Sequence, residues 1–235
     1  MKILSIDTSS NNCSVAVVDE KAMLGEININ YNLQHSVLLM PLIEELLMRL
    51  DLKVKELDAL TLSTGPGSFT GLRIGLSAAK GLALGADLPI FASDALSILA
   101  YGVYGFSGIL VPMVDALRGG FYTGLYTFQD GKLTTLMEPA ILTLEEVKQK
   151  LESEERDILI LGDIVDKIGD EELKFKENVS TAPASLNIPK ASNIPYLLWD
   201  RIQSGESDDL HSLVPVYMRK SQAEYEYEKK IGILK

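Results

Sequence analysis

The hydrophobic positions of this chain follow two spacings that alternate along it. Short apolar runs, each bounded by polar or glycine-containing turns, predict strands at residues 3–6, 13–18, 22–30, 57–62, 89–92, 109–114, 121–128, 132–137 and 157–161. Longer segments with helical spacing of apolar residues predict helices at residues 36–50, 76–85, 95–101 and 191–203, and a further helix that opens at Thr143. This alternation predicts an α/β fold.

The order of the predicted elements repeats after about residue 105. In each half a strand ends at an aspartate, Asp7 first and Asp115 later, and two more strands follow as a meander before helices and strands alternate. We therefore predict two domains with mixed sheets flanked by helices, residues 1–105 and 106–220, of which the second is truncated. Residues 221–235 are predicted to form a charged tail outside the core.

The first predicted helix, residues 36–50, is apolar over most of its circumference. Glu44, Glu45 and Arg49 are its clear interruptions, and Ser36 is the predicted N-cap. One face of such a helix can pack on a sheet, but the other face also needs cover, because it is too apolar to face water. A neighbouring helix or a partner subunit can provide this cover.

Residues 63–75, with the sequence STGPGSFTGLRIG, connect a predicted strand to the second predicted helix. The GPG turn is typical of positions where φ is positive or where a side chain would collide with its surroundings. Ser68 or Thr70 can then cap the helix. A strand, a glycine turn and a helix N-terminus can bind an anion, but an ordinary tight turn has the same pattern, so both interpretations stay open.

Small residues recur at every fourth position of the second helix, at Gly71, Gly75, Ala79 and Ala83. Because glycine in a helix costs about 1 kcal/mol relative to alanine, this spacing indicates a close backbone approach along one side. We interpret the two helices as a candidate protein–protein surface. Its predicted residues are Leu38, Leu39, Leu42, Ile43, Leu46, Leu47, Gly71, Leu72, Gly75, Ala78, Ala79 and Leu82. Alternatively, the two helices cover only each other and the sheet.

The polar turn after the first strand contains the candidate ligand-binding residues. Asp7 can hold a hydrated cation while Thr8 and Ser9 face a phosphate, and Asp115 ends the equivalent strand of the second half. We take these four residues as a degenerate nucleotide or phosphate site. The other interpretation is a polar hairpin turn.

Composition restricts the function further. The 235 residues carry a net charge of −11, which argues against nucleic-acid binding through the chain's own electrostatics. Cys13 is the single cysteine and is interpreted as a core residue of a protein from a reducing compartment. His35 and His211 have no metal-like partner at helical spacing, so we predict no metal site. No signal peptide or membrane span is expected, and the expected location is the cytoplasm.

Three stretches, residues 3–9, 65–75 and 114–122, resemble the bacterial TsaB (YeaZ) family of tRNA threonylcarbamoyladenosine biosynthesis proteins, as does the shorter segment VYMR at residues 216–219. The likeness spans about residues 1–220, and the duplicated halves resemble the wider actin, Hsp70 and sugar-kinase superfamily. The resemblance implies duplicated ribonuclease H-like, actin-like ATPase domains. It also implies a non-catalytic subunit that binds the catalytic paralogue TsaD, which transfers a threonylcarbamoyl group to the adenosine beside the tRNA anticodon.

The sequence departs from that catalytic relative at two places. The relative carries Cys-Asp-Glu where this chain has Ser10, Asn11 and Asn12, and it carries a histidine metal motif where residues 92–98 contain no histidine. The resemblance therefore implies no activity of the chain alone, with the ATPase TsaE as a third component, a homodimer in isolation, and contact with tRNA only through the complex. No cofactor is expected of the chain itself; the alternative is weak binding of ATP or ADP with Mg²⁺ at the degenerate site or at a subunit interface.

Two other functions stay open. An active ATPase or small-molecule kinase would use Asp7 and Asp115 to organise Mg²⁺ and phosphates, although the best glycine for an adenosine pocket in the second half is Gly162. A metalloprotease fits less well, because its metal needs three or four suitable ligands. The glycine turn fits neither a dinucleotide-binding motif nor a P-loop, since Thr70 replaces the third glycine and no Gly-Lys-Ser/Thr sequence follows.

Overall fold

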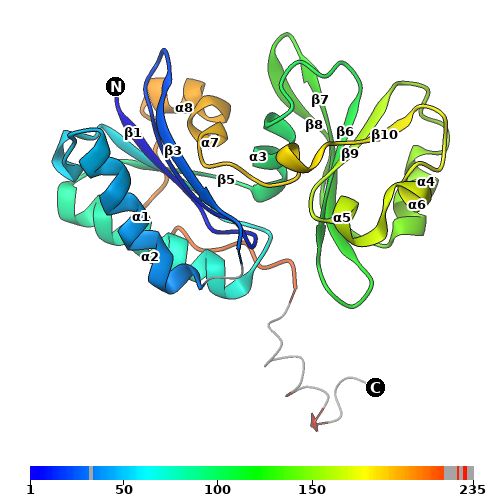
Figure 1. Cartoon of the computed structure of the whole chain (residues 1–235), viewed down its shortest axis with the longest axis horizontal. Helices are drawn as coiled ribbons and strands as arrows, with labels where there is room; N and C mark the ends of the chain where they lie inside the picture. Colours follow the sequence, from blue (N-terminus) through cyan, green and yellow to red (C-terminus); the bar gives the residue numbers. More distant parts are fainter. Residues whose placement is uncertain (32–33, 220–226, 228–229, 232–235) are drawn as a thin grey trace.

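The computed structural model describes residues 1–31, 34–219, 227, 230 and 231, so most of the predicted charged tail lies outside the described residues. Two five-stranded sheets stand side by side, with helices between them and on their outer faces (Figure 1). The predicted α/β class with mixed sheets flanked by helices is confirmed.

The first sheet has the strand order β3-β2-β1-β4-β5. Its strands are β1 (Ile3–Asp7), β2 (Cys13–Val18), β3 (Met23–Ile29), β4 (Ala59–Ser63) and β5 (Ile90–Ser93). Strand β1 pairs antiparallel with β2 and parallel with β4, so a meander joins a parallel half that needs helical crossovers. The helices that accompany this sheet are α1 (His35–Arg49), α2 (Phe69–Ala86) and α3 (Ala95–Tyr101), and a short 3₁₀ turn is η1 (Val54–Glu56).

The second sheet repeats this topology with the order β10-β9-β6-β7-β8. Its strands are β6 (Ile109–Asp115), β7 (Phe121–Gln129), β8 (Lys132–Leu142), β9 (Ile158–Leu161) and β10 (Val179–Thr181). The remaining helices are α4 (Leu144–Leu151), α5 (Ile164–Ile168), α6 (Asp170–Leu173), η2 (Ala184–Leu186), α7 (Asn193–Leu197) and α8 (Trp199–Ser204). Strand β6 has the central position in the second sheet that β1 has in the first. The predicted duplication is therefore confirmed, and Asp7 and Asp115 lie at equivalent strand ends.

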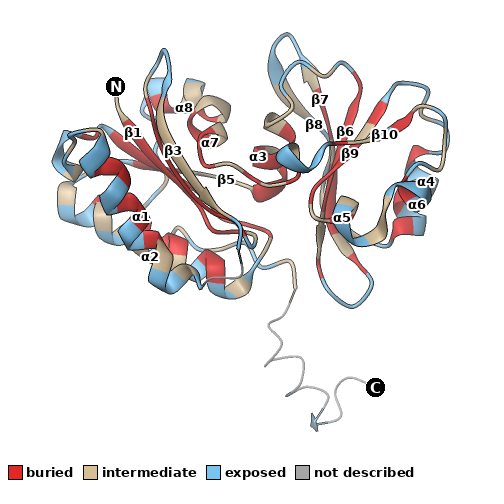
Figure 2. Cartoon of the chain, viewed as in Figure 1, coloured by how far each residue is buried: buried red, intermediate tan, exposed pale blue. Residues whose placement is uncertain are grey.

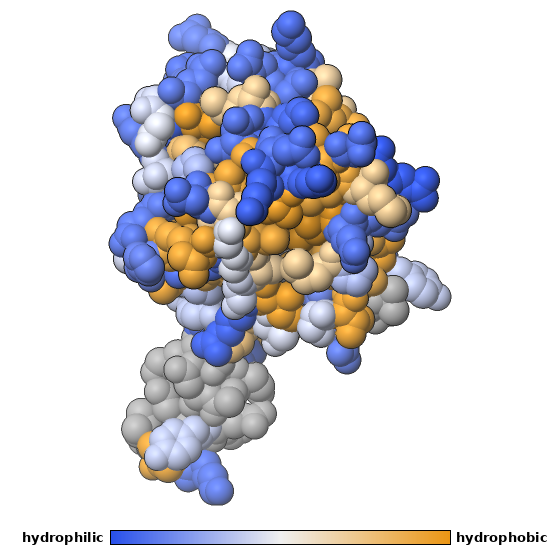
Figure 3. Space-filling view, turned by 90° about the vertical axis from the view of Figure 1, so that its left-hand side faces the viewer, coloured by the Kyte–Doolittle hydropathy of each residue, from blue (hydrophilic) through white to orange (hydrophobic). Residues whose placement is uncertain are grey.

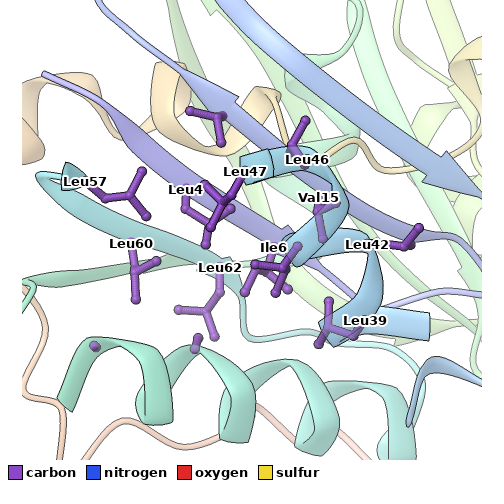
Figure 4. Packing of buried hydrophobic residues seen from close by; sticks show 14 of the residues in the cluster. Leu4, Ile6, Val15, Leu39, Leu42, Leu46, Leu47, Leu57, Leu60 and Leu62 are labelled. Atoms are coloured by element: carbon purple, nitrogen blue, oxygen red, sulfur yellow. The ribbon is translucent and has the colours of Figure 1, made fainter. Parts of the chain in front are cut away.

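A hydrophobic core fills the space between the first sheet and helices α1 and α2 (Figures 2 and 4). Strand residues such as Leu4, Ile6 and Leu62 lie close to leucines of α1, among them Leu39 and Leu46. Separate clusters join α4, α5 and α6 to the second sheet and α3 to strands β6 and β7. Burial of apolar surface, at about 25 cal/mol per Å², is the main force that holds each sheet to its helices.

After the second sheet the chain returns to the first domain. Helices α7 and α8 pack on the inner face of the first sheet in a cluster with Ile3, Phe91 and Ile98. The segment that follows runs to the free edge at β5, where the amide of Asp208 donates to the carbonyl of Ile90. The predicted domain boundary at residue 105 does not describe this arrangement, because α7 and α8 come after the second sheet in the chain but pack on the first sheet.

Polar side chains of the first sheet hold the returning segment in place. The Ser5 hydroxyl donates to the carbonyl of Ala191 (2.6 Å), and the Ser14 hydroxyl accepts from the amide of Ala191 (2.8 Å). The side-chain amide of Asn12 donates to the carbonyl of Pro189 (2.9 Å). The two hydroxyls and the Nδ2 of Asn12 are therefore hydrogen-bonded by the returning chain, as buried polar groups usually are.

Local signals in the sequence place several helix ends correctly. The Ser68 hydroxyl accepts from the amide of Gly71, and the carboxylate of Asp94 caps α3. Thr143 and Glu146 form the expected reciprocal capping box of α4. Gly65 has a φ of 99°, as the GPG turn predicted.

Other predicted boundaries are wrong. Gln34, not Ser36, is the N-cap residue of α1, and Ser36 lies in the first turn. The predicted helix at residues 191–203 consists of two short helices that meet at Leu198. Helices α5 and α6 and strand β10 were not predicted, because they have three to five residues and lack the continuous apolar run that marks the equally short strands β5 and β9.

Candidate functional sites on the helical face and in the interdomain cleft

Most of the predicted interface residues belong to the core of the first domain. The side chains of Leu39, Leu42, Ile43, Leu46, Leu47, Leu72 and Ala79 are buried, as are Gly71 and Gly75, whereas Leu38, Ala78 and Leu82 are half-buried. The prediction needs this correction because the inner sides of α1 and α2 pack against the sheet. A partner can reach only the half-buried and exposed positions of the two helices.

The small-residue side of α2 faces the turn after β1. A Cβ atom at Gly71 would lie 2.2 Å from the carbonyl oxygen of Thr8, and a Cβ atom at Gly75 would lie 2.2 Å from the Thr8 Oγ1. Gly67, just before the helix, is equally tight, with a Cβ position 2.0 Å from the carbonyl oxygen of Ser9. The predicted close backbone approach is confirmed, but its neighbour is the chain's own turn.

A groove between the outer sides of α1 and α2 is open to solvent. It has a volume of about 720 Å³ and is lined by Ser36, Leu39, Met40, Phe69, Thr70, Arg73, Ile74, Ser77 and Ala78. Figure 3 looks onto the side of the molecule where α1 and α2 lie, and it shows hydrophobic side chains gathered in a patch with hydrophilic ones around it. Val37, Met40, Met48 and Leu84 are exposed on these two helices. Such a patch is typical of a protein–protein interaction site.

A cleft of about 660 Å³ separates the two domains. The first domain contributes Ser9, Ser10, Asn11, Asn30 and residues 67–70; the second contributes residues 114–118, Tyr122, Asp163, Asp166 and Lys167; the returning chain contributes Asn187, Ile188 and residues 216–219. The fold family implies a nucleotide with Mg²⁺ at such a cleft. Whether the cleft can hold Mg²⁺ with a nucleotide depends on Asp7 and Asp115, the aspartates at the ends of β1 and β6.

The carboxylate of Asp7 is sealed beneath the cleft. The amide and the hydroxyl of Ser9 both donate to its Oδ1 (2.9 and 2.7 Å), and its buried Oδ2 has no partner among the described residues. Burial raises the pKa of Asp7 to about 6, although the hydrogen bonds from Ser9 and the charge of His35 act in the opposite direction. Thr8 is also buried and donates its hydroxyl to Gly71, so Asp7 and Thr8 do not line the cleft.

Asp115 does line the cleft, but its carboxylate is already engaged. Its Oδ2 accepts from Lys167 (2.8 Å) and its Oδ1 accepts from the amide of Leu117 (2.7 Å), while Lys167 also donates to Asp163 (2.7 Å). Burial alone would raise the pKa of Asp115, but the hydrogen bonds from Lys167 and Leu117 outweigh it and lower the pKa. With Asp7 sealed and Asp115 paired to an ammonium group, the residues present do not fit a hydrated Mg²⁺.

Three residues at the mouth of the cleft form a stack that the sequence-based interpretation missed. The ring of Tyr217 lies on that of Phe69, with 4.6 Å between centroids, and the guanidinium of Arg73 lies 4.1 Å from the Phe69 centroid. Arg73 also donates its Nε–H to the Tyr217 hydroxyl (2.7 Å). The family-like segment at residues 216–219 was the signal that could have indicated Tyr217. It could not indicate the partners of Tyr217, because Phe69 and Arg73 are distant from it in the sequence.

The other candidate groups have structural surroundings. Cys13 is fully buried, and burial raises the pKa of its thiol to about 11. The His35 Nε2 lies 2.8 Å from the carbonyl of Ser10, and His211 is exposed. Within the described part of the chain, no three His, Cys, Asp or Glu side chains lie where they could share a metal ion. Among the same described residues, no helix is both long enough and apolar enough to span a membrane.

Comparison with known proteins agrees with this arrangement. Residues 25–227 match the family model described as TsaD, tRNA N6-adenosine threonylcarbamoyltransferase. The chain is 34% identical to the tRNA threonylcarbamoyladenosine biosynthesis protein TsaB of Bacillus subtilis, over 95% of this chain and 96% of that protein. The structure of YeaZ from Pseudomonas aeruginosa is 27% identical, with a TM-score of 0.80 over 92% of this chain and 99% of that one.

A more distant structure shows the wider fold. The activator of 2-hydroxyisocaproyl-CoA dehydratase from Clostridium difficile has a TM-score of 0.53 at 10% identity, over 89% of this chain and 99% of that one. Its likeness concerns the two-domain fold alone. The identity and coverage of the nearer relatives carry the assignment: the chain belongs to the TsaB family of tRNA threonylcarbamoyladenosine biosynthesis proteins.

Proposed function

We propose that this chain serves in tRNA threonylcarbamoyladenosine biosynthesis as a non-catalytic subunit that binds the catalytic paralogue TsaD. The observation that carries this proposal is the apolar groove between α1 and α2, open to solvent above a core that is already complete. Relatives named for this pathway support the pathway itself. The burial of Asp7 and the pairing of Asp115 support a role in assembly, because Asp7 does not reach the cleft and Asp115 is bound to Lys167.

The assembly that we propose has TsaE as a third component and takes place in the cytoplasm. Without TsaD, the groove pairs with the same groove of a second copy. Removing an apolar surface of this kind from water is favourable whichever complementary surface covers it. The chain itself contacts tRNA only through the complex, since its net charge of −11 opposes an approach to phosphate.

Charge placed in the groove is expected to break the complex. Met40→Glu and Ser77→Arg put a charge on exposed positions of α1 and α2 and should each weaken binding to TsaD by about tenfold or more, which corresponds to ~1.4 kcal/mol. Because both positions are exposed, the melting temperature should stay close to that of the parent. The measurement is the affinity for purified TsaD together with the modification of tRNA by the mixture.

Leu136→Glu is the matched control, since Leu136 is exposed on β8 of the other domain. It should leave both the affinity and the tRNA modification unchanged. Full affinity of the Met40→Glu and Ser77→Arg variants would show that the groove is not the TsaD-binding surface.

We also propose that the chain requires no nucleotide of its own. Calorimetric titration with ATP and Mg²⁺ is expected to give no binding tighter than a dissociation constant of about 1 mM, because Lys167 occupies the position beside Asp115 that a cation would take. The cleft and its fold favour one alternative, an active ATPase or small-molecule kinase. Micromolar binding of ATP with steady turnover would establish that alternative instead.

A further inference from the structure

Residues 216–219 are held by the first domain at one end. The amide of Val216 donates to the carbonyl of Thr64 (2.9 Å), at the end of β4. Tyr217 follows in the stack with Phe69 and Arg73, where it has both a ring contact and a hydrogen bond through its hydroxyl. A stacked aromatic pair of this kind stabilises the contact beyond the burial of its surface.

The other end of the same short segment is held by the second domain. Met218 packs against the cluster that contains Tyr122 and Tyr126 of β7. The guanidinium of Arg219 donates to the carbonyl of Leu117, and its Nη2 lies 2.8 Å from where a Cβ at Gly120 would be. Four consecutive residues therefore bridge the mouth of the cleft. Val216 and Tyr217 are fixed to the first domain and Arg219 to the second, while Met218 packs on the cluster where α3 meets β6 and β7.

The turn that receives Arg219 is held in an unusual backbone conformation. Leu117, Arg118 and Gly119 have φ values of 62°, 55° and 75° in succession. Residues other than glycine rarely adopt positive φ, and such a turn persists only where its surroundings fix it. Asp115 provides the fixing contact, since its Oδ1 accepts from the amide of Leu117 and its Oδ2 is held by Lys167. The carbonyl of Leu117 is thereby presented toward Arg219.

The direct connection between the domains has the composition of a hinge. It runs from the end of α3 to the start of β6 and contains Gly102, Gly105 and Gly108, of which Gly102 and Gly108 pack closely against Asn193 and Asp157. Gly105 has a φ of 88° and would meet no atom within 4 Å if it carried a Cβ. A glycine with positive φ and free space around it can absorb backbone rotation without a clash.

We propose that residues 216–219 form a latch that holds the interdomain cleft closed, with Arg219 as the group that fastens it to the second domain. When the hydrogen bond from Arg219 to Leu117 breaks, the mouth of the cleft loses this link, and the second domain can rotate about the glycine-containing connection and the α3 contact with β6 and β7 beside it. Opening then exposes the cleft-lining side chains of Ser9 and Asn187, which are buried while the cleft is closed. The latch gives Asp115 a structural role, because that carboxylate shapes the turn to which Arg219 binds.

The distance between the two domains tests the latch in the isolated full-length chain. Spin labels at Lys55→Cys and Glu138→Cys lie on exposed positions of the first and second domain, and Cys13 is fully buried and so escapes labelling. Pulsed electron paramagnetic resonance should give one narrow distance distribution for this labelled parent. Adding Arg219→Ala should lengthen the mean distance and widen the distribution at least about twofold.

Arg156→Ala is the matched control, because Arg156 pairs with Glu154 inside the second domain and crosses no cleft. It should leave the distribution unchanged. Tyr217→Ala releases the latch at its other end and should widen the distribution as Arg219→Ala does. The latch is refuted if both variants melt like the parent and their distance distributions superimpose on it.

Discussion

Replacing Gly71 by alanine is expected to destabilise the protein by about 3 kcal/mol. The added Cβ would lie 2.2 Å from the backbone oxygen of Thr8, which no side-chain rotation can relieve. Either α2 or the turn after β1 must shift, and the hydrogen bond from the Thr8 hydroxyl to the Gly71 carbonyl is lost with that shift. Urea denaturation followed by circular dichroism measures the change in the free energy of unfolding.

The same substitution at another glycine of this helix is the control, because it should have the opposite effect. Gly81 lies in α2 and would meet no atom within 4 Å if it carried a Cβ. Gly81→Ala should therefore stabilise the protein by ~0.5–1 kcal/mol, since alanine loses less backbone entropy on entering a helix. Effects of the same sign at Gly71 and Gly81 would contradict the close contact with Thr8.

Replacing Asp7 by asparagine is expected to stabilise the protein at alkaline pH and to have little effect near pH 4. The pKa of Asp7 is about 6 in the folded chain against an ordinary 3.8. Between these values the folded state keeps a proton that the unfolded state has lost, so the stability of the parent falls as the pH rises toward 6. Above pH 6 the full cost of the buried charge is present, roughly 3 kcal/mol for a pKa raised from 3.8 to about 6.

Asparagine avoids that charge and keeps an oxygen that can accept both hydrogen bonds from Ser9. The expected gain in the free energy of unfolding at pH 8 is therefore ~1–3 kcal/mol, reduced by the imperfect surroundings of the new amide. Asp19→Asn is the control, because hydrogen bonds from the amides of Lys21 and Ala22 lower the pKa of this half-buried residue. Asp19→Asn should give no gain at pH 8. A difference between Asp7→Asn and the parent that does not change with pH would contradict the buried charge.

The sequence alone identifies the architecture well because strands and their ends leave local signals. The aspartates that close β1 and β6 and the caps at Ser68 and Asp94 are all visible within a few residues. The hydrophobic period also identifies α1 as a helix with too much apolar surface. It does not say which of its leucines meet the sheet, because that depends on how the helix is rotated about its own axis.

Contacts between distant residues account for what the sequence could not show. The spacing of Gly71 and Gly75 indicates a close approach, but Thr8 as the neighbour follows only when α2 is laid across the turn after β1. The hydrogen bond from Arg219 to Leu117 joins residues 102 positions apart. No periodicity or local motif carries that information.

The hydroxyl groups of Ser5 and Ser14 have a consequence for how this protein can be divided. Both bind the backbone of Ala191, which the chain reaches only after completing the second sheet. A fragment that ends at the sequence repeat would lose these two hydrogen bonds and the one from Asn12 to Pro189, although Ser5 would still accept from Thr61 and Asn12 would still donate to Asn28. Each lost hydrogen bond costs about 0.5–1.5 kcal/mol. The sequence repeat thus reflects the common strand order of the two sheets. It does not divide the chain into two domains that fold independently.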